Sequence, residues 1–301
     1  MQQRITEQRN SRSLNIDTMS TVEIIKLINQ EDQQVPAIIG QPNVQDAIAT
    51  IIDQIVLSFQ NNGRLFYLGA GTSGRLGILD AAECVPTFGS APEMIQGLIA
   101  GGSGALIKAV EGAEDSAELG ANDLKEKQLA ENDFVLGIAA SGRTPYVIGG
   151  LDYAKSIGCQ TGALSCNNNA IISRHATYAI EAVVGPEVIT GSTRMKAGTA
   201  QKLILNTIST TAMIKLGKVY SNLMVDVQPT NLKLVDRAKR IIQDATDVDY
   251  KTATQFYNDA AGQPKVAIVM INGQVSRQQA EQILNANNGF ISRALDSLII
   301  N

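Results

Sequence analysis

Apolar residues recur at helical spacing in two stretches near the start of the chain. Within residues 21–29 they return every three or four positions between polar stretches, and a longer stripe of the same period covers residues 44–59. The first pattern predicts an N-terminal helix with an extended arm over residues 1–45. The second predicts a packed helix at the start of a larger domain.

A unit then repeats in which a short apolar run ends in a polar or glycine-containing turn and is followed by a helical pattern. The predicted strands are residues 64–68, 94–99, 134–139, 160–165 and 178–183. Helices are expected from about Ser73, from Ala105 and after Pro145, since proline suits the first helical turn. Strands that alternate with helices form a parallel sheet covered on both faces. The fold class is therefore predicted to be α/β, a doubly wound parallel sheet flanked by helices, in a domain over residues 46–235.

The pattern changes in the last third of the chain. An apolar pattern over residues 198–216 predicts one further long helix. After about residue 235, short helical stretches alternate with glycine and asparagine turns. They cover residues 237–245, 250–260, 265–270, 277–286 and 290–298. This pattern predicts a small helical C-terminal module over residues 236–301.

Composition narrows the classes of function. The chain has 301 residues, 44% of them hydrophobic and 18% charged, which are ordinary globular values. With a net charge of -4 it lacks the excess of Lys and Arg that would neutralise a phosphate backbone, so nucleic acid is not an expected partner. No run of ~18 apolar residues and no signal-peptide pattern is present, so no membrane partner is expected. Three cysteines without a CxxC pair predict reduced thiols and a cytoplasmic location.

Histidine and tryptophan are scarce. His175 is the single histidine, which excludes a His-rich zinc site and leaves one residue for any Ser–His or Cys–His mechanism. We interpret His175 as structural, and we predict no bound metal. Because the chain has no tryptophan, a sugar would be held mainly by polar contacts and not by stacking on aromatic rings.

Two turns after predicted strands carry the residues expected to bind a ligand. Residues 69–74 match GxGxxG, but the following strand lacks the acidic residue that a dinucleotide site needs at its end. A phosphate monoester fits better, because a helix N-terminus offers backbone N–H groups and nearby hydroxyls add hydrogen bonds. Residues 140–144 repeat this chemistry after another strand. The predicted substrate-binding residues are Gly71, Thr72, Ser73, Ser141, Gly142 and Thr144.

These turns resemble a known family. Gly-Thr-Ser-Gly-Arg at 71–75 and Ala-Ser-Gly-Arg-Thr-Pro-Tyr at 140–146 resemble the sugar isomerase (SIS) domain, which binds phosphosugars. Longer stretches resemble the N-acetylmuramic acid 6-phosphate etherases, namely residues 6–10, 80–88, 110–116 and 190–199. The similarity covers nearly the whole chain. Ala82 and Val85 depart from it, since the family often has serine and proline there.

The resemblance implies a lyase of carbohydrate metabolism, active in amino sugar catabolism and cell wall recycling, that needs no cofactor. It would split the D-lactyl ether of N-acetylmuramic acid 6-phosphate by elimination and water addition, giving N-acetylglucosamine 6-phosphate and D-lactate. Glu83 would be the principal acid/base and Glu114 a second catalytic carboxylate. The family forms homodimers with the active-site cleft at the subunit interface, which implies the same here.

Four cations lie near the predicted loops. Arg75, Arg143 and Arg194 are as well suited to solvent as to a ligand. Lys196 is the strongest candidate for binding the substrate, because it precedes a predicted helix in a polar turn of Gly, Ser and Thr.

The spacing of Glu83 raises a geometric question. In a helix from Ser73, Glu83 would lie ~15 Å along the axis, farther than a hexose phosphate reaches. Either Pro86 ends the helix early and the chain folds back, or Glu83 serves a pocket of a partner subunit.

Two other functions fit the same architecture. One is a phosphosugar sensor that regulates another protein, and the other is an aldose–ketose isomerase. The presence of Glu83 and Glu114 favours an enzyme over a sensor, since a sensor needs no proton carriers. Release of lactate would distinguish the etherase from the isomerase.

Overall fold

The computed structural model describes residues 4–108, 110–228 and 232–299. The chain forms two compact units, one from Met1–Ala82 and Pro92–Ser209 and the other from Glu83–Ala91 and Thr210–Asn301. The predicted domain limits (1–45, 46–235 and 236–301) take in stretches outside the described residues, and these limits stay predictions.

The first unit contains a five-stranded parallel sheet in the order β2-β1-β3-β4-β5. Its strands are β1 (Leu65–Gly69), β2 (Ile95–Ile99), β3 (Phe134–Ile138), β4 (Gln160–Ser165) and β5 (Tyr178–Glu181). Gly69 at the end of β1 pairs with Ile99 and with Ile138, so three strands end at one level. In this strand order the winding reverses between β1 and β3, and ligands of such sheets bind at that point. The predicted doubly wound parallel sheet is confirmed.

Helices precede, connect and follow the strands. Up to β5 they are η1 (Ile5–Glu7), η2 (Ser11–Ser13), η3 (Ile16–Thr18), α1 (Thr21–Asp32), α2 (Gln34–Ile39), α3 (Pro42–Gln60), α4 (Gly71–Phe88), η4 (Ser103–Leu106), η5 (Ala113–Asp115), α5 (Ala117–Glu126), α6 (Pro145–Ser156) and α7 (Ile171–His175). After β5 they are α8 (Lys196–Lys215), α9 (Leu232–Thr246), α10 (Tyr250–Asp259), α11 (Pro264–Gly273), α12 (Arg277–Ala286) and α13 (Ile291–Ile299). Among the described residues, no helix has both the length and the apolar character to span a membrane.

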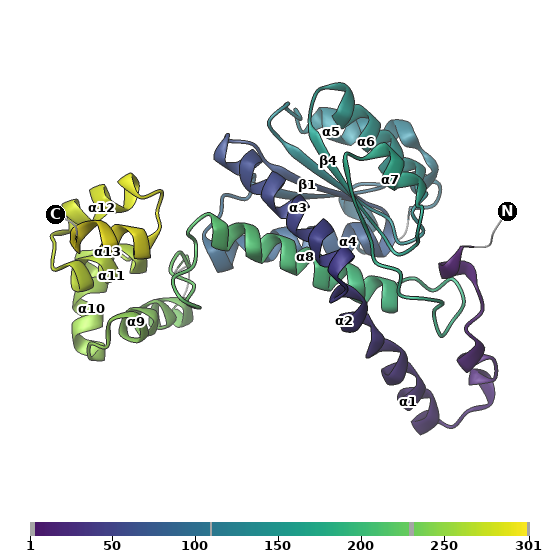
Figure 1. Ribbon diagram of the computed structural model, residues 1–301, viewed down its shortest axis with the longest axis horizontal. Helices are drawn as coiled ribbons and strands as arrows, with labels where there is room; N and C mark the ends of the chain where they lie inside the picture. Colours follow the sequence, from purple (N-terminus) through teal and green to yellow (C-terminus); the bar gives the residue numbers. More distant parts are fainter. Residues whose placement is uncertain (1–3, 109, 229–231, 300–301) are drawn as a thin grey trace. The chain divides into compact units, whose positions relative to one another are not determined.

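Both faces of the sheet are covered, as near-continuous apolar strands require. Every residue of β1 and β3 is buried. Leu68 faces α6, where a Cβ on Gly150 would lie 2.1 Å from Leu68 Cδ2. Its neighbour Tyr67 faces α4, where a Cβ on Gly77 would lie 2.8 Å from Tyr67 Cβ. Figure 1 shows α5, α6 and α7 over one face and α3 and α4 over the other.

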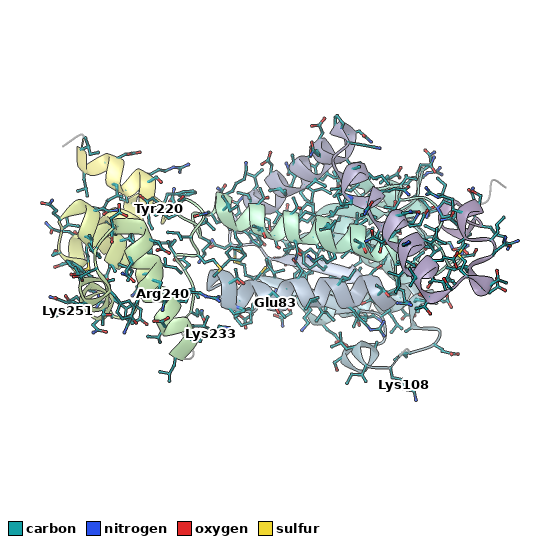
Figure 2. All side chains as sticks on the ribbon, turned by 90° about the horizontal axis from the view of Figure 1, so that it is seen from below. Glu83, Lys108, Tyr220, Lys233, Arg240 and Lys251 are labelled. Atoms are coloured by element: carbon teal, nitrogen blue, oxygen red, sulfur yellow. The ribbon has the colours of Figure 1, made fainter. Side chains whose placement is uncertain are left out.

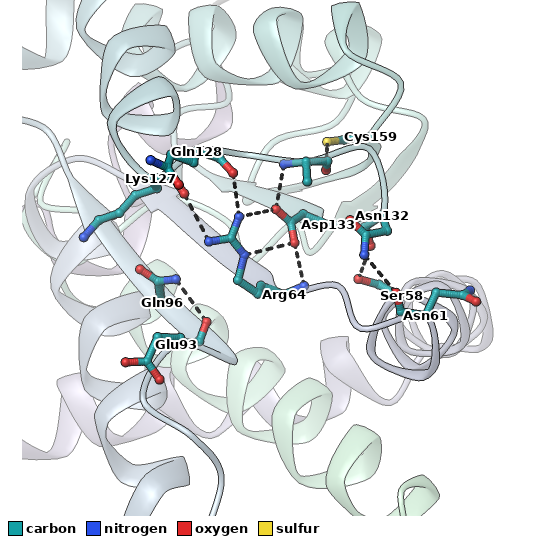
Figure 3. A network of polar contacts seen from close by, with 11 residues as sticks. Ser58, Asn61, Arg64, Glu93, Gln96, Lys127, Gln128, Asn132, Asp133 and Cys159 are labelled. Atoms are coloured by element: carbon teal, nitrogen blue, oxygen red, sulfur yellow. Dashed lines mark hydrogen bonds and ion pairs between the residues drawn. The ribbon is translucent and has the colours of Figure 1, made fainter.

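An ion pair between Arg64 and Asp133 lies at the amino ends of β1 and β3, the end of the sheet opposite the candidate turns (Figure 3). Asp133 is 2% exposed and accepts hydrogen bonds from the backbone N–H of Arg64 at 2.7 Å and from its guanidinium at 2.6 Å. The same guanidinium donates to the carbonyls of Lys127 and Gln128. These contacts join the segments that enter β1 and β3, and so help to hold the two strands in register.

The prediction of an α-helix from Ala105 is wrong. Ala105 lies in the 3₁₀ helix η4, which ends at Leu106, and one residue of the predicted helix, 109, lies outside the described residues. The next α-helix is α5, whose N-cap Ser116 accepts from the N–H of Leu119 at 3.2 Å. Gly112 before it has a left-handed backbone with φ of 76°, which breaks any helix running through this segment.

Of the two alternatives for Glu83, the one in which the helix ends early at Pro86 is also wrong. α4 continues to Phe88 with Pro86 inside it. Pro86 lies in the last turn of α4. Because proline has no N–H, the helix lacks a single hydrogen bond there. Glu83 is therefore a residue of α4, as Figure 2 shows, and its side chain is exposed. The chain does not fold back to return Glu83 towards the start of this helix.

The second unit contains the predicted helical C-terminal part. Its core is formed by residues of α9 to α13 around the buried run Ala267, Ile268 and Val269 of α11. Lys265, at the start of α11, donates to Asp226 Oδ2 at 2.7 Å and to the carbonyl of Gly217 at 3.0 Å. These contacts tie the segment after α8 to the helical core.

Candidate functional site

The turn from β1 into α4 has the geometry of an anion site. Gly71 adopts φ of +52°, a left-handed conformation that favours glycine. A Cβ on Gly74 would lie 2.7 Å from Ile99 Cγ1 and 2.8 Å from the carbonyl oxygen of Gly69, so only glycine lets the helix start this close to the strand. The N-terminus of an 18-residue helix thus lies at the carboxyl end of β1, where its free N–H groups and dipole favour a negative charge.

A pocket of about 190 Å³ lies beside this turn. Its lining residues are Ala70, Gly71, Arg75, Ala100, Ala105, Val110, Glu111, Gly112 and Glu114. The structure therefore brings Glu114, on η5, to the same pocket as Gly71. Arg75 donates to the carbonyls of Ala105 at 2.7 Å and Leu106 at 2.9 Å, so its guanidinium holds η4 against α4.

The turn from β3 into α6 offers hydroxyls at the neighbouring strand end. Gly142 has φ of +71°, and a Cβ there would lie 2.5 Å from Ala170 Cβ, so glycine is required. Thr144 is the N-cap of α6 and makes no side-chain capping bond. Within the described residues, no hydrogen bond occupies the hydroxyls of Thr72, Ser141 or Thr144. These groups are free to donate to a ligand.

A second pocket, of about 320 Å³, adjoins this turn. It is lined by Ser141, by the N-terminal residues Arg4, Ile5 and Gln8, and by Asn167, Asn168, Asn169, Ala170 and Ile171 after β4. The two turns thus follow adjacent strands but line different pockets. That both turns hold a single phosphosugar stays a prediction.

The N-terminal contribution to the second pocket was missed by sequence reasoning. Asn167 donates to Thr6 Oγ1 at 2.9 Å and to the carbonyl of Ala140 at 3.0 Å. Its Oδ1 accepts from the backbone N–H of Thr6 at 3.3 Å. The N-terminal arm is therefore attached to the carboxyl ends of β3 and β4. The unusual stretch at residues 6–10 was the available signal.

Lys196, predicted to bind substrate, is buried in an internal ion pair. It is 2% exposed, and its Nζ donates to Glu31 Oε2 at 2.7 Å. Glu31 also lies 2.6 Å from Arg12 and accepts from Asn10 at 2.9 Å. A role for Lys196 in substrate binding stays a prediction, and its ammonium already holds α8 to α1.

Another buried carboxylate caps the start of α8. Glu187 is fully buried and accepts from the backbone N–H groups of Lys196 at 3.0 Å and Ala197 at 2.9 Å. Burial raises the pKa of Glu187. For Glu31, burial favours the neutral form, but the hydrogen bonds and charges of Lys196, Asn10 and Arg12 outweigh it and lower its pKa.

Replacing Glu31 by glutamine should strongly destabilise the protein. The change leaves the buried Lys196 ammonium beside a neutral amide, and breaking one side of a buried pair costs ~3–5 kcal/mol. The melting temperature should fall by about 2–4 °C for each kcal/mol. Thermal unfolding followed by circular dichroism measures the shift. Asp32→Asn, at the next residue of α1, is the matched control.

The pH dependence provides a second test of the same pair. Because the pKa of folded Glu31 lies below its ordinary value of 4.5, its stabilisation is present above that pH and is lost as pH falls through the lowered pKa. The difference in melting temperature between wild type and Glu31→Gln should thus shrink in acid. A difference that stays constant down to pH ~3 would contradict the ion pair as its cause.

The remaining predicted residues lie apart from these pockets or are exposed. Glu83 belongs to the second unit and Glu114 to the first, so their action at one centre stays a prediction. Arg143 and Arg194 are exposed. His175, at the end of α7, pairs with Asp152 through Nδ1 at 2.6 Å.

The sequence matches known families over most of its length. Residues 47–155 match the glucokinase regulatory protein N-terminal SIS domain, and residues 118–210 match the SIS domain. The chain is 57% identical over 290 residues to the N-acetylmuramic acid 6-phosphate etherase of Exiguobacterium, covering 96% of this chain and 98% of the relative. It is 55% identical to N-acetylmuramic acid 6-phosphate etherase 2 of Lactiplantibacillus plantarum, covering 97% of this chain and 98% of that protein.

Solved structures share the fold at low sequence identity. A phosphoheptose isomerase from Francisella tularensis superposes with a TM-score of 0.52 and 16% identity, covering 65% of this chain and 100% of that one. This likeness shows a shared fold, and the SIS domain match over residues 118–210 identifies the sheet with its helices as SIS-type.

Proposed function

The chain belongs to the N-acetylmuramic acid 6-phosphate etherases, and from this membership we propose that it cleaves the D-lactyl ether of N-acetylmuramic acid 6-phosphate. The products are N-acetylglucosamine 6-phosphate and D-lactate. The observation that carries the proposal in the structure is the pocket in which Glu114 lies beside the Gly71 turn at the N-terminus of α4. A carboxyl group, the proposed proton carrier, thus lies next to the helix N-terminus that we propose as the anion site.

The two turns at the winding reversal are proposed to bind the phosphosugar. The hydroxyls of Thr72, Ser73, Ser141 and Thr144, with the backbone N–H of Gly71, are the donors. The N–H of Gly142 already donates to the carbonyl of Ala139 at 2.9 Å, so Gly142 serves the site by shaping the turn. Phosphate oxygens accept strong, charge-assisted hydrogen bonds from such groups. The hydroxyl-rich turns need no metal for this task.

The chemistry requires proton transfers at two positions, C2 of the sugar and the oxygen on C3. In the ring-opened sugar, the C1 aldehyde makes the proton on C2 acidic. A carboxylate removes this proton, the electron pair forms the C2–C3 double bond, and the C3–O bond to lactate breaks while its oxygen takes up a proton. Water then adds at C3 and C2 is reprotonated. A carboxyl group serves as base and then as acid in such a cycle, and we assign these tasks to Glu83 and Glu114.

Incubation with N-acetylmuramic acid 6-phosphate tests the proposal. D-lactate and N-acetylglucosamine 6-phosphate should form in equal amounts, measured by coupled lactate oxidation and by mass spectrometry of the sugar. An isomerised sugar without lactate would instead identify an isomerase. Tight binding without turnover would identify a sensor.

We further propose a homodimer in which Glu83 acts in the pocket of the partner subunit. Support comes from the unbroken helix α4, along which Glu83 lies ~15 Å from Ser73. The exposed side chains of Glu83 and Glu114 agree with a site completed by a second copy.

Mixed dimers should recover activity that each variant lacks. Glu83→Gln and Glu114→Gln subunits, co-expressed with different tags, would form hybrids in which one of the two symmetric sites has both carboxylates. With random pairing, lactate release should return to about a quarter of the wild-type value. If both residues serve the site of their own subunit, no hybrid regains activity.

A cytoplasmic location is also proposed. Cys84, Cys159 and Cys166 are buried thiols that form no disulfide bond. Burial raises the pKa of Cys159 and of Cys166 to about 12, so both stay protonated and poorly reactive at neutral pH. Thiols that form no disulfide suit a reducing compartment.

A further inference from the structure

The buried amide of Gln201, on α8, is the hydrogen-bond partner of Ser73. Ser73 Oγ donates to Gln201 Oε1 at 2.9 Å. Ser73 is 7% exposed and Gln201 is fully buried. A serine hydroxyl has a single hydrogen. In this arrangement Ser73 therefore has no hydrogen left to donate to a ligand, unlike Thr72, Ser141 and Thr144.

The other end of the same amide has no partner. Among the described residues, Gln201 Nε2 is one of the few buried side-chain atoms without a hydrogen bond. Buried donors are almost always paired, since a lost hydrogen bond inside a protein is not replaced by water. The amide therefore has an unused donor, which the reversed orientation of the Ser73–Gln201 pair would use.

The first turns of α8 hold this amide at the candidate phosphate site. Gly198 lies three residues before Gln201, which places both on one face of the helix. A Cβ on Gly198 would lie 3.5 Å from Thr72 Cγ2, so this face packs directly on the turn. Gln201 therefore reaches Ser73 from inside the protein, on the side away from solvent.

We propose that Gln201 is a positioning residue that redirects the Ser73 hydroxyl when a phosphosugar binds. The amide turns over, so that Nε2 donates to Ser73 Oγ and Ser73 donates its hydrogen to a phosphate oxygen. The two ends of a carboxamide have nearly the same shape, so the turn needs no repacking. The buried NH₂ gains an acceptor and Ser73 gains a charged one, while the carbonyl left behind is the milder group to leave unpaired.

Binding of N-acetylglucosamine 6-phosphate, measured by calorimetry, tests the pair in a double-mutant cycle. This inference rests on the proposed placement of the phosphate at Ser73. Ser73→Ala should weaken binding about 10- to 100-fold, because a bond to a charged group is lost. Gln201→Met, similar in size but unable to hydrogen-bond, should weaken it about three- to tenfold. The double variant should bind no more weakly than Ser73→Ala alone.

Two further measurements separate positioning from simple packing. Gln201→Met should change the melting temperature little, since the loss of its bond to Ser73 is offset by removal of an unpaired buried donor. Unphosphorylated N-acetylglucosamine should not distinguish this variant from wild type. Gln201→Glu can only accept from Ser73 and adds a negative charge, so it should weaken phosphosugar binding more than Gln201→Met. Gln45→Met, at an exposed position of α3, is the control.

The outcomes distinguish this inference from the one on which it rests. If Ser73→Ala binds weakly while both Gln201 variants bind like wild type, the positioning role is overturned and the phosphate placement stands. Independent, additive losses in the double variant would also overturn it. If Ser73→Ala itself binds like wild type, the placement of the phosphate fails and the positioning role fails with it.

Discussion

Replacing Glu114 by glutamine is expected to lower the rate of lactate release about 100- to 10,000-fold. The amide keeps the size of the side chain but cannot carry a proton to or from the sugar. Glu114 lines the pocket beside Gly71, so the loss should appear in kcat, with a smaller change in KM.

The neighbouring acid provides the matched control for this change. Asp115 lies on the same 3₁₀ turn, is exposed, and does not line the pocket. Asp115→Asn should therefore retain wild-type activity. If both variants lost the same amount of activity, the loss would come from the changed charge of the turn, and Glu114 would not be a catalytic carboxylate.

Glu83→Gln is expected to lower lactate release over the same range, about 100- to 10,000-fold, through loss of the principal acid/base. Because Glu83 is an exposed residue of α4, the melting temperature should not change. Solvent exchange provides a finer readout. If Glu83 serves the departing oxygen and Glu114 the C2 proton, Glu83→Gln should still exchange the C2 proton with D₂O, and Glu114→Gln should not.

Glu93→Gln is the control for Glu83, because Glu93 is an exposed acid in the segment between α4 and β2. It should leave the rate unchanged. Full activity of Glu83→Gln would refute its assignment and would leave Glu114 as the only carboxylate with a proposed role.

Local sequence patterns were sufficient to predict the five strands of the sheet. Buried strands of a parallel sheet are short apolar runs, and the glycine and hydroxyl turns that follow β1 and β3 mark where each one ends. Parallel strands that alternate with helices have few possible arrangements, so it was predictable as well that the two turns would follow adjacent strands at the same end of the sheet. The helix expected from Ala105 failed because Ala105 and Leu106 lie in the short 3₁₀ helix η4, and the left-handed backbone of Gly112 prevents a helix from running on into α5.

The tertiary structure decided which polar groups meet. Lys196 and Glu31 are separated by 165 positions and Ser73 and Gln201 by 128, and no local pattern encodes either pair. Sequence reasoning placed Lys196 at the substrate because it precedes a helix in a polar turn of Gly, Ser and Thr, whereas the fold buries its ammonium beside Glu31 of α1. The sequence by itself determined the strands, the two glycine- and hydroxyl-rich turns that are the candidate anion site, and the family. Only the fold determined which charges are paired and which hydroxyls remain free, because burial and pairing depend on elements brought together across the whole chain.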